Sequence, residues 1–202
     1  MTTENVKINI KRLCVIDFDS TLMNTIMPLI GKSMWEKYYN KPFEFKGWWG
    51  RKESLDLNVF DIKPFDNVLN LLNKEVKNPE SYVMILTSRQ EKLRPQLQAV
   101  LDKNHIVVDR LDMKKYEKNK GEKILDYIKE FPKLKEIDVY DDRDLDIQSY
   151  KEIESKIPKT IKFRIHLAKE GELSIVNENR GISEKINEEI INLIKKIKGL
   201  YL

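Results

Sequence analysis

Short apolar runs alternate along this chain with amphipathic helical patterns. Each apolar run ends near polar, reactive residues. The apolar runs cover residues 13–18, 82–86, 105–108 and 137–140. Each run has the length of a buried strand. Strands that alternate with helices predict βαβ units and a mostly parallel sheet. Because the carboxyl ends of parallel strands meet at one edge of the sheet, we expect a ligand site there.

The segments between and after these runs predict the remaining elements. Helical spacing of apolar residues indicates helices within residues 64–76, 93–101, 120–129 and 144–153. Residues 161–167 and 172–176 alternate around Gly171, which predicts two strands joined by a turn. Isoleucine and leucine residues at helical spacing between 182 and 197 indicate a terminal amphipathic helix. The predicted fold is therefore α/β, with three layers and a mostly parallel central sheet.

The 202 residues suit a single domain, 1–202, with one small insert. Residues 23–63 are irregular and rich in aromatic side chains, with a helical turn expected at 34–40 and a loop at 42–51. We expect this insert to form a flap or minimal cap. Residues 160–202 are expected to complete the core with a hairpin and a helix.

Composition limits where the chain acts and what it binds. The formal net charge of +4 favours a polyanionic partner without demonstrating one. Cys14 is the only cysteine, which excludes an internal disulfide, and its apolar surroundings predict burial. No apolar run approaches the roughly 18 residues of a membrane span. No signal peptide is recognisable, so a cytoplasmic location is expected and no membrane partner. His105 and His166 lie in strand-like runs and are interpreted as structural.

Asp17 and Asp19 lie at the carboxyl end of the first apolar run. Residues two apart on an extended chain point to the same side. Two close carboxylates repel each other, so a cation or a shared proton is expected between them. Phosphoryl transfer uses such a pair, with one carboxylate as nucleophile and the other as acid, and Mg²⁺ offsets the negative charge. The alternative is a solvated acidic turn or a helix cap.

Four segments in order resemble the motifs of the haloacid dehalogenase (HAD) superfamily. Residues 13–22 match an apolar strand followed by DxDxT, and residues 83–87 match an apolar strand that ends in threonine. Lys120 and Gly121 at the start of a helix match the third motif, and residues 137–142 match an apolar strand that ends in acids. The resemblance spans residues 10–150 and implies a Rossmann-like core.

The resemblance also implies residue roles typical of the phosphatase branch. Asp17 would be the nucleophile, and Asp19 the general acid and then the base that activates water. Thr87 would hydrogen-bond a phosphoryl oxygen, and Lys120 would offset its charge. Asp17, the backbone carbonyl of Asp19 and an acid of the last motif would hold Mg²⁺. Asp141 and Asp142 rank equally for that last ligand, and Asp146 ranks lower.

Some of these assignments have alternatives. Thr87 could instead cap the helix that follows. Lys118 and Lys123 compete with Lys120, although Gly121 matches the family spacing. Ser20 stands where these phosphatases often have glycine, and we expect altered loop dihedrals there.

Two tripeptides narrow the substrate class. Thr87-Ser88-Arg89 and Asp141-Asp142-Arg143 resemble signatures of polynucleotide 3′-phosphatases and, more closely, of the phosphatase-like domain of Swiss Army Knife RNA-repair proteins. Ser88, Arg89 and Arg143 are therefore predicted to bind substrate, since guanidinium groups suit phosphate. Arg143 could instead pair with a neighbouring acid, and Arg89 could be structural. Asp146 stands where that pattern has histidine.

Trp48 and Trp49 either stack on a nucleobase or pack in the insert.

The sequence thus predicts a Mg²⁺-dependent phosphomonoester hydrolase that acts through an aspartyl-phosphate. The leading substrate is a terminal phosphate of RNA or DNA. A small-molecule phosphomonoester is the second hypothesis, and a non-catalytic binding module on the same fold is the third.

Overall fold

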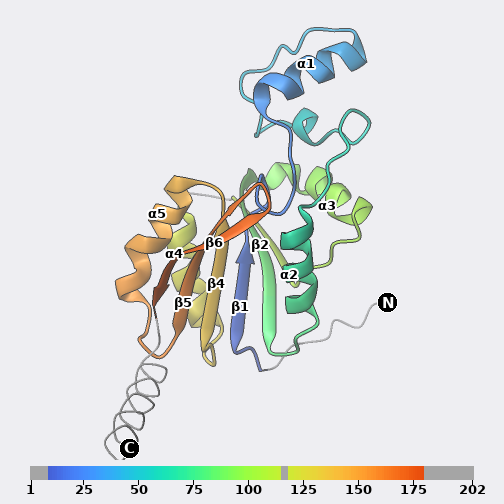
Figure 1. Ribbon diagram of the computed structural model, residues 1–202. Coiled ribbons are helices and arrows are strands. Elements are labelled where there is room, and N and C mark those ends of the chain that lie inside the picture. Colours follow the sequence, from blue (N-terminus) through green and yellow to red (C-terminus); the bar gives the residue numbers. More distant parts are fainter. Residues whose placement is uncertain (1–8, 115–117, 180–202) are drawn as a thin grey trace, which may run out of the picture.

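The computed structural model describes residues 9–114 and 118–179 and places them in a six-stranded sheet with helices on both faces (Figure 1). The strands lie in the order β3-β2-β1-β4-β5-β6. The first five are parallel, and β6 runs antiparallel to β5. Their bounds are β1 (Arg12–Ile16), β2 (Ser81–Gln90), β3 (Arg110–Lys114), β4 (Glu136–Asp141), β5 (Lys162–Lys169) and β6 (Glu172–Asn179).

Two pairs of helices bury the two faces of the sheet. Four helices make these layers: α2 (Asp66–Val76), α3 (Arg94–Lys103), α4 (Lys120–Glu130) and α5 (Asp144–Ile153). Cys14 and Ile16 pack in the apolar cluster with residues of α2 and α3, whereas Leu13 and Val15 pack with residues of α4 and α5. Alternate residues of a strand point to opposite faces, so one short strand serves both layers. The predicted three-layer α/β fold and the burial of Cys14 are confirmed.

The insert stands above the carboxyl ends of the strands (Figure 1). It contains α1 (Pro28–Tyr39) and the 3₁₀ helix η1 (Lys52–Leu55). Helix α1 begins at Pro28, six residues before the helical turn that was predicted to start at residue 34. Proline is well tolerated in the first turn of a helix. Trp48 packs so closely on Gly31 that a Cβ there would lie 2.2 Å from the indole. The insert therefore has a packed apolar interior, which is part of the same cluster as residues of α2 and α3.

The third strand predicted from the sequence is wrong. Residues 105–108 form no strand, and His105 adopts a positive φ of 54°. Ile106 is buried in the apolar cluster next to α3 without pairing to the sheet. The observed β3 is Arg110–Lys114, which pairs with the second half of β2. Burial by side-chain packing and burial by strand pairing produce the same apolar signal, and the sequence does not separate them.

The end of the described chain is a hairpin, as predicted. Strands β5 and β6 pair around Gly171, whose φ of 84° is readily adopted by glycine. The predicted helix at residues 182–197 lies outside the described residues. Two further 3₁₀ helices, η2 (Glu91–Leu93) and η3 (Glu154–Lys156), flank α3 and α5. Within residues 9–114 and 118–179, no helix has the length and apolar character needed to cross a membrane.

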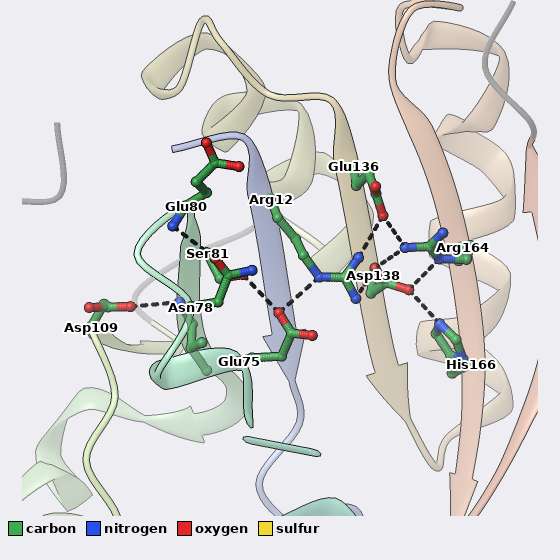
Figure 2. Close-up of polar contacts among 11 residues, drawn as sticks. Arg12, Glu75, Asn78, Glu80, Ser81, Asp109, Glu136, Asp138, Arg164 and His166 are labelled. Carbon is green, nitrogen blue, oxygen red and sulfur yellow. Dashed lines mark hydrogen bonds and ion pairs between the residues drawn. The ribbon is translucent and has the colours of Figure 1, made fainter. Parts of the chain in front are cut away.

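A network of charged side chains crosses the amino-terminal half of the sheet (Figure 2). Arg12 of β1 pairs with Glu75 of α2 and with Asp138 of β4. Asp138 is 1% exposed and also binds Arg164 and His166 of β5. His166 stacks on Tyr140 with ring centroids 4.3 Å apart, so its interpretation as structural fits these contacts. The network joins three strands and one helix at the end of the sheet opposite the carboxyl ends.

Candidate active site

Three neighbouring strands deliver the predicted site residues to one edge of the sheet. β1 pairs with β2 on one side and with β4 on the other. Asp17 follows the last residue of β1, and its backbone N–H donates to Tyr140 of β4 over 2.9 Å. Asp141 ends β4, and Thr87 lies near the end of β2. The pairing register therefore brings together side chains from residues 17, 87 and 141.

Lys120 lies between two of these acids. Its Nζ donates to Asp17 Oδ1 over 2.6 Å and to Asp141 Oδ2 over 2.7 Å. All three side chains are at most 5% exposed. Burial lowers the pKa of Lys120, but the charges of Asp17 and Asp141 outweigh that effect and raise it, so the lysine carries its proton. The competing lysines pair with other acids: Lys118 pairs with Asp126, and Lys123 pairs with Asp112.

Lys120 is held at the start of α4 by a capping box. Asn119 accepts a hydrogen bond from the backbone of Glu122, and the Glu122 side chain accepts one from the backbone of Asn119. Such reciprocal caps fix where a helix starts. The first helical residue, Lys120, is thereby directed toward the carboxyl ends of the strands.

Asp17, Asp141 and Asp142 form a cluster whose ligand oxygens lie within 4.8 Å of one another. Burial raises the pKa of Asp17 well above its usual range. The charge of Lys120 lowers this pKa, and repulsion from Asp141 raises it further. Burial and the charge of Asp141 raise the pKa of Asp142 to about 6. Lys120 contacts two of these three carboxylates, and carboxylate oxygens are the ligands that Mg²⁺ prefers. The donor set therefore fits a hard divalent cation.

Asp141 is fixed by further contacts. The Tyr150 hydroxyl of α5 donates to Asp141 Oδ2 over 3.3 Å, and the backbone of Arg143 donates to Oδ1 over 3.2 Å. Asp146 lies outside the carboxylate cluster and sits 3.4 Å from Lys120 Nζ. Which acid binds a metal directly stays a prediction.

Asp19 has a different partner from Asp17. Arg89 donates from Nε to Asp19 Oδ2 over 2.8 Å and from Nη2 to Oδ1 over 2.7 Å. The Asp19 side chain is not part of the three-carboxylate cluster, and its predicted metal contact is the backbone carbonyl. Arg89 was predicted to bind substrate, and its guanidinium instead contacts this acid. A substrate role for Arg89 stays a prediction.

The loop after Asp17 turns back on itself. Ser20 has a φ of 56°, in the left-handed region that favours glycine, and its N–H donates to the carbonyl of Met23. Serine therefore adopts a backbone conformation that glycine reaches at little cost. Thr21, which is fully buried, donates to Asp142 Oδ1 over 3.5 Å and links this loop to the acids after β4.

Thr87 is buried within β2, and α3 begins only at Arg94. The alternative role of Thr87 as a helix cap is therefore excluded. Its Oγ1 accepts a hydrogen bond from the backbone of Arg89 over 3.2 Å. Ser88 and Arg143 are exposed, and both line the cavities described next.

Two adjoining cavities open at this edge of the sheet. The first, of about 540 Å³, contains Asp17 and Asp19 and is walled by Met27, Trp49 and Gly50 of the insert. The second, of about 460 Å³, lies beside Lys120 and has several basic residues in its lining: Lys114, Lys118, Lys123 and Arg143. Thr87, Ser88, Lys114 and Arg143 line both cavities. The cavity that holds Asp17 and Asp19 thus shares part of its lining with a basic cavity.

Trp48 and Trp49 have opposite surroundings. Trp48 is 2% exposed, and its Nε1 donates to the carbonyl of Ile26 over 2.8 Å. Trp49 is half-buried, and its ring lies 5.3 Å from the Arg89 guanidinium. Packing is therefore the role of Trp48, whereas Trp49 is available to a ligand in the first cavity.

Sequence reasoning missed two residues of the site, Ser54 and Tyr150, and one contact, that of Arg89 with Asp19. Ser54 hydrogen-bonds Arg89, Tyr150 hydrogen-bonds Asp141, and Arg89 binds Asp19. Ser54 and Tyr150 lie in segments whose sequence carries no recognisable motif. The pair of Arg89 and Asp19 joins residues 70 apart, so no local spacing predicts it.

Comparison with solved structures identifies the fold. The HAD domain of effector protein Lem4 from Legionella pneumophila superposes with a TM-score of 0.51 and 16% sequence identity, over 81% of this chain and 89% of that domain. This chain has a HAD-like fold. An inactive mutant of the same Lem4 domain gives a TM-score of 0.50 at 15% identity, over 81% of this chain and 88% of that one.

A haloacid dehalogenase-like hydrolase, SP0104 from Streptococcus pneumoniae, is similar at a TM-score of 0.48 and 14% identity, over 71% of this chain and 80% of that one. No protein-family model and no curated protein sequence matches the chain. At these identities the similarity concerns the HAD-like fold, and the activity must be argued from the site.

Proposed function

We propose that this chain is a Mg²⁺-dependent phosphomonoester hydrolase of the HAD type, with Asp17 as the nucleophile. One observation carries the proposal: a single buried lysine, Lys120, bridges Asp17 and Asp141 at the carboxyl ends of β1 and β4. A structural ion pair needs one acid, whereas this lysine contacts two members of a cluster of three carboxylates. Such surplus negative charge in a buried site suits a reaction that recruits a divalent cation and a phosphate.

The residues divide the proposed reaction between them. Asp17 attacks phosphorus, so that its oxygen forms a bond to phosphorus while the bond to the leaving oxygen breaks. In its protonated form, Asp19 donates a proton to that leaving oxygen. The resulting carboxylate, which Arg89 contacts through both oxygens, then accepts a proton from the water that attacks the aspartyl-phosphate. This second attack releases phosphate and restores the Asp17 carboxylate.

The surrounding groups supply charge and orientation. Lys120 would offset charge on the phosphoryl oxygens, and Thr87 would hydrogen-bond one of them. Asp17, Asp141 and Asp142 would hold Mg²⁺, which supplies positive charge opposite the phosphate. Burial raises the pKa of Asp17, whereas cations at this edge lower it. Cations therefore favour the ionised form of Asp17 that attacks phosphorus.

The test is hydrolysis of p-nitrophenyl phosphate with and without Mg²⁺. We expect turnover that requires Mg²⁺ and falls by at least about 10³-fold in Asp17→Asn, because the amide is no nucleophile. Asp102→Asn, which alters an exposed acid on α3, should retain full activity. Absence of Mg²⁺-dependent turnover, or an active Asp17→Asn variant, would favour a non-catalytic binding module on this fold.

For the substrate, we propose a terminal phosphate of RNA or DNA. The support is the basic cavity that adjoins the one holding Asp17 and Asp19, because a phosphodiester beside the scissile phosphate would meet Lys114 and Arg143 there. Lys118, Lys123 and Arg143 each lie beside an acidic partner, so Lys114 carries most of this argument. A small-molecule phosphomonoester is the second candidate, since a cavity of about 540 Å³ has the size of a small-molecule site.

The substrate classes separate in a direct comparison. RNA and DNA oligonucleotides with 3′- or 5′-phosphates are compared with a panel of phosphorylated metabolites. We expect at least one oligonucleotide class to be preferred, with a preference that weakens at high salt and in Lys114→Gln. Lys151→Gln, on the exposed side of α5, is the matched control. Activity confined to metabolites would overturn the nucleic-acid proposal and leave the phosphatase proposal intact.

A further inference from the structure

We infer that Arg89 is a positioning residue that ties Asp19 to the insert, so that the placement of the proposed acid and base depends on how the insert is seated. The inference rests on the proposed phosphatase function. It assigns Arg89 a different role from the direct contact with substrate that its sequence motif suggested.

The first half of the connection is the ion pair with Asp19. Two parallel hydrogen bonds of 2.8 and 2.7 Å join the guanidinium to both carboxylate oxygens. The Arg89 side chain is 1% exposed, and that of Asp19 is 21% exposed. A bidentate pair fixes orientation as well as distance, because both groups are planar. Asp19 therefore takes its direction from Arg89.

The second half of the connection reaches the insert. Arg89 Nη1 donates to Ser54 Oγ over 2.7 Å and to the carbonyl of Trp49 over 3.0 Å. Ser54 is fully buried, and its hydroxyl donates in turn to the carbonyl of Arg51 over 2.7 Å. These bonds attach the start of η1 and the loop before it to the end of β2.

One rigid group thus fixes two parts of the site. The four hydrogen bonds use four of the five N–H donors of a guanidinium. The insert cannot shift at Trp49 and Ser54 without moving Arg89 or breaking two buried hydrogen bonds, and an orphaned buried donor is costly. Trp49 walls the cavity in which the leaving group must sit, beside Asp19. Movement of this wall is therefore transmitted to the acid.

The two possible roles of Arg89 predict different kinetics. An arginine that binds the phosphoryl group affects every substrate and the affinity for inorganic phosphate. An arginine that positions Asp19 affects the proton transfer to the leaving oxygen, so a poor leaving group suffers most. p-Nitrophenyl phosphate needs little protonation of its leaving group, whereas glycerol 2-phosphate, an alkyl phosphate, depends on it.

The experiment measures kcat and KM for both substrates in Arg89→Met, Arg89→Lys and Ser54→Ala, and inhibition by inorganic phosphate. For Arg89→Met, we expect kcat with glycerol 2-phosphate to fall about 10-fold or more beyond the fall with p-nitrophenyl phosphate. Arg89→Lys should recover only part of this difference, because one ammonium cannot replace the fork. Ser54→Ala should shift the ratio in the same direction by a smaller factor, and inhibition by phosphate should stay within about 2-fold.

Arg94→Met is the matched control, because Arg94 pairs with Glu91 at the start of α3 and should leave the ratio unchanged. The ratio of two substrates does not depend on the fraction of folded enzyme, so partial unfolding of a variant does not obscure it. Equal losses with both substrates together with weaker phosphate inhibition would overturn the inference, and so would an unchanged ratio in Ser54→Ala. If the unaltered protein hydrolyses neither substrate with Mg²⁺, the proposed function itself fails.

Discussion

Lys120 is the residue on which the charge balance of the site depends. It is 5% exposed and lies within 3.4 Å of three carboxylates, those of Asp17, Asp141 and Asp146. Removing water from so many charges is costly unless they are paired and hydrogen-bonded. The site keeps more negative than positive charge, which a fold selected for stability alone would avoid. This imbalance is the physical basis of the proposed Mg²⁺ dependence.

The two adjacent tryptophans of the insert should respond oppositely to truncation. Trp48→Ala removes a fully packed indole between Gly31 and Phe60, so we expect the free energy of unfolding to fall by about 4 kcal/mol. Trp49→Ala should cost about 1 kcal/mol or less, because its ring is partly exposed, and should instead raise KM for substrates with bulky leaving groups. Urea denaturation and steady-state kinetics separate the two effects. Similar losses of stability in both variants would contradict the division.

At the scale of elements, the position of Lys120 depends on how closely α4 approaches α5. Gly121 lies directly against α5, where its N–H donates to Ser149 Oγ over 3.2 Å. The Ser149 carbonyl occupies the space in which a side chain at residue 121 would begin. Glycine is therefore required here for close approach of two backbones, and its φ is ordinary.

Gly121→Ala should disturb both stability and catalysis. An added Cβ would lie 2.2 Å from the Ser149 carbonyl oxygen, a backbone atom that cannot rotate away. We expect the helices to separate, at a cost of about 2 kcal/mol in the free energy of unfolding, and activity to fall because Lys120 is displaced. Gly50→Ala is the stability control, since its Cβ would have no heavy atom within 4 Å. Equal unfolding midpoints for Gly121→Ala and the unaltered protein would show that the helix contact tolerates the methyl group.

At the scale of the whole molecule, charge is used differently at the two ends of the sheet. The carboxyl ends carry acids in excess around Lys120. The amino-terminal half carries a network in which each of three acids, Asp138, Glu75 and Glu136, contacts Arg12 or Arg164 (Figure 2). A network in which every acid contacts an arginine contributes to stability, whereas a cluster with surplus acids creates a need for a ligand.

The network around Asp138 should make the stability of the fold sensitive to acid. Burial alone raises the pKa of Asp138, but hydrogen bonds with Arg164 and His166 and the charge of Arg12 lower it to about 2. A carboxyl group with a lowered pKa stabilises the fold above its ordinary pKa of 3.8, and that contribution is lost as the pH falls toward 2. We expect the loss to be about 2 kcal/mol.

Asp138→Asn isolates this contribution. The variant should be less stable at pH 7 by about 3 kcal/mol, because Arg12 and Arg164 lose a buried partner. Its stability should also change less than that of the unaltered protein between pH 4 and pH 2. Urea denaturation at each pH provides the measurement, with Asp102→Asn as the control. Parallel stability curves for Asp138→Asn and the unaltered protein would refute the role of Asp138.

Local pattern was sufficient to predict most of the architecture. Buried strands and amphipathic helices have short-range periodicities, so the ends of β1 and β4 and the start of α4 could be placed from the residues alone. Asp17, Thr87, Lys120 and Asp141 were therefore assigned to one edge of a parallel sheet before any contact was known. The apolar run at 105–108 was misjudged, because its burial comes from packing against α3 and not from pairing.

The tertiary structure decided how those residues interact. Asp17 and Asp19 are two residues apart, yet one binds Lys120 and the other Arg89. Trp48 and Trp49 are adjacent, yet one is core and the other lines a cavity. These differences arise from contacts between segments 22 to 103 residues apart along the chain. The sequence by itself determined which side chains gather with Asp17 at the carboxyl ends of the strands. Only long-range packing determined the hydrogen-bond partner of each.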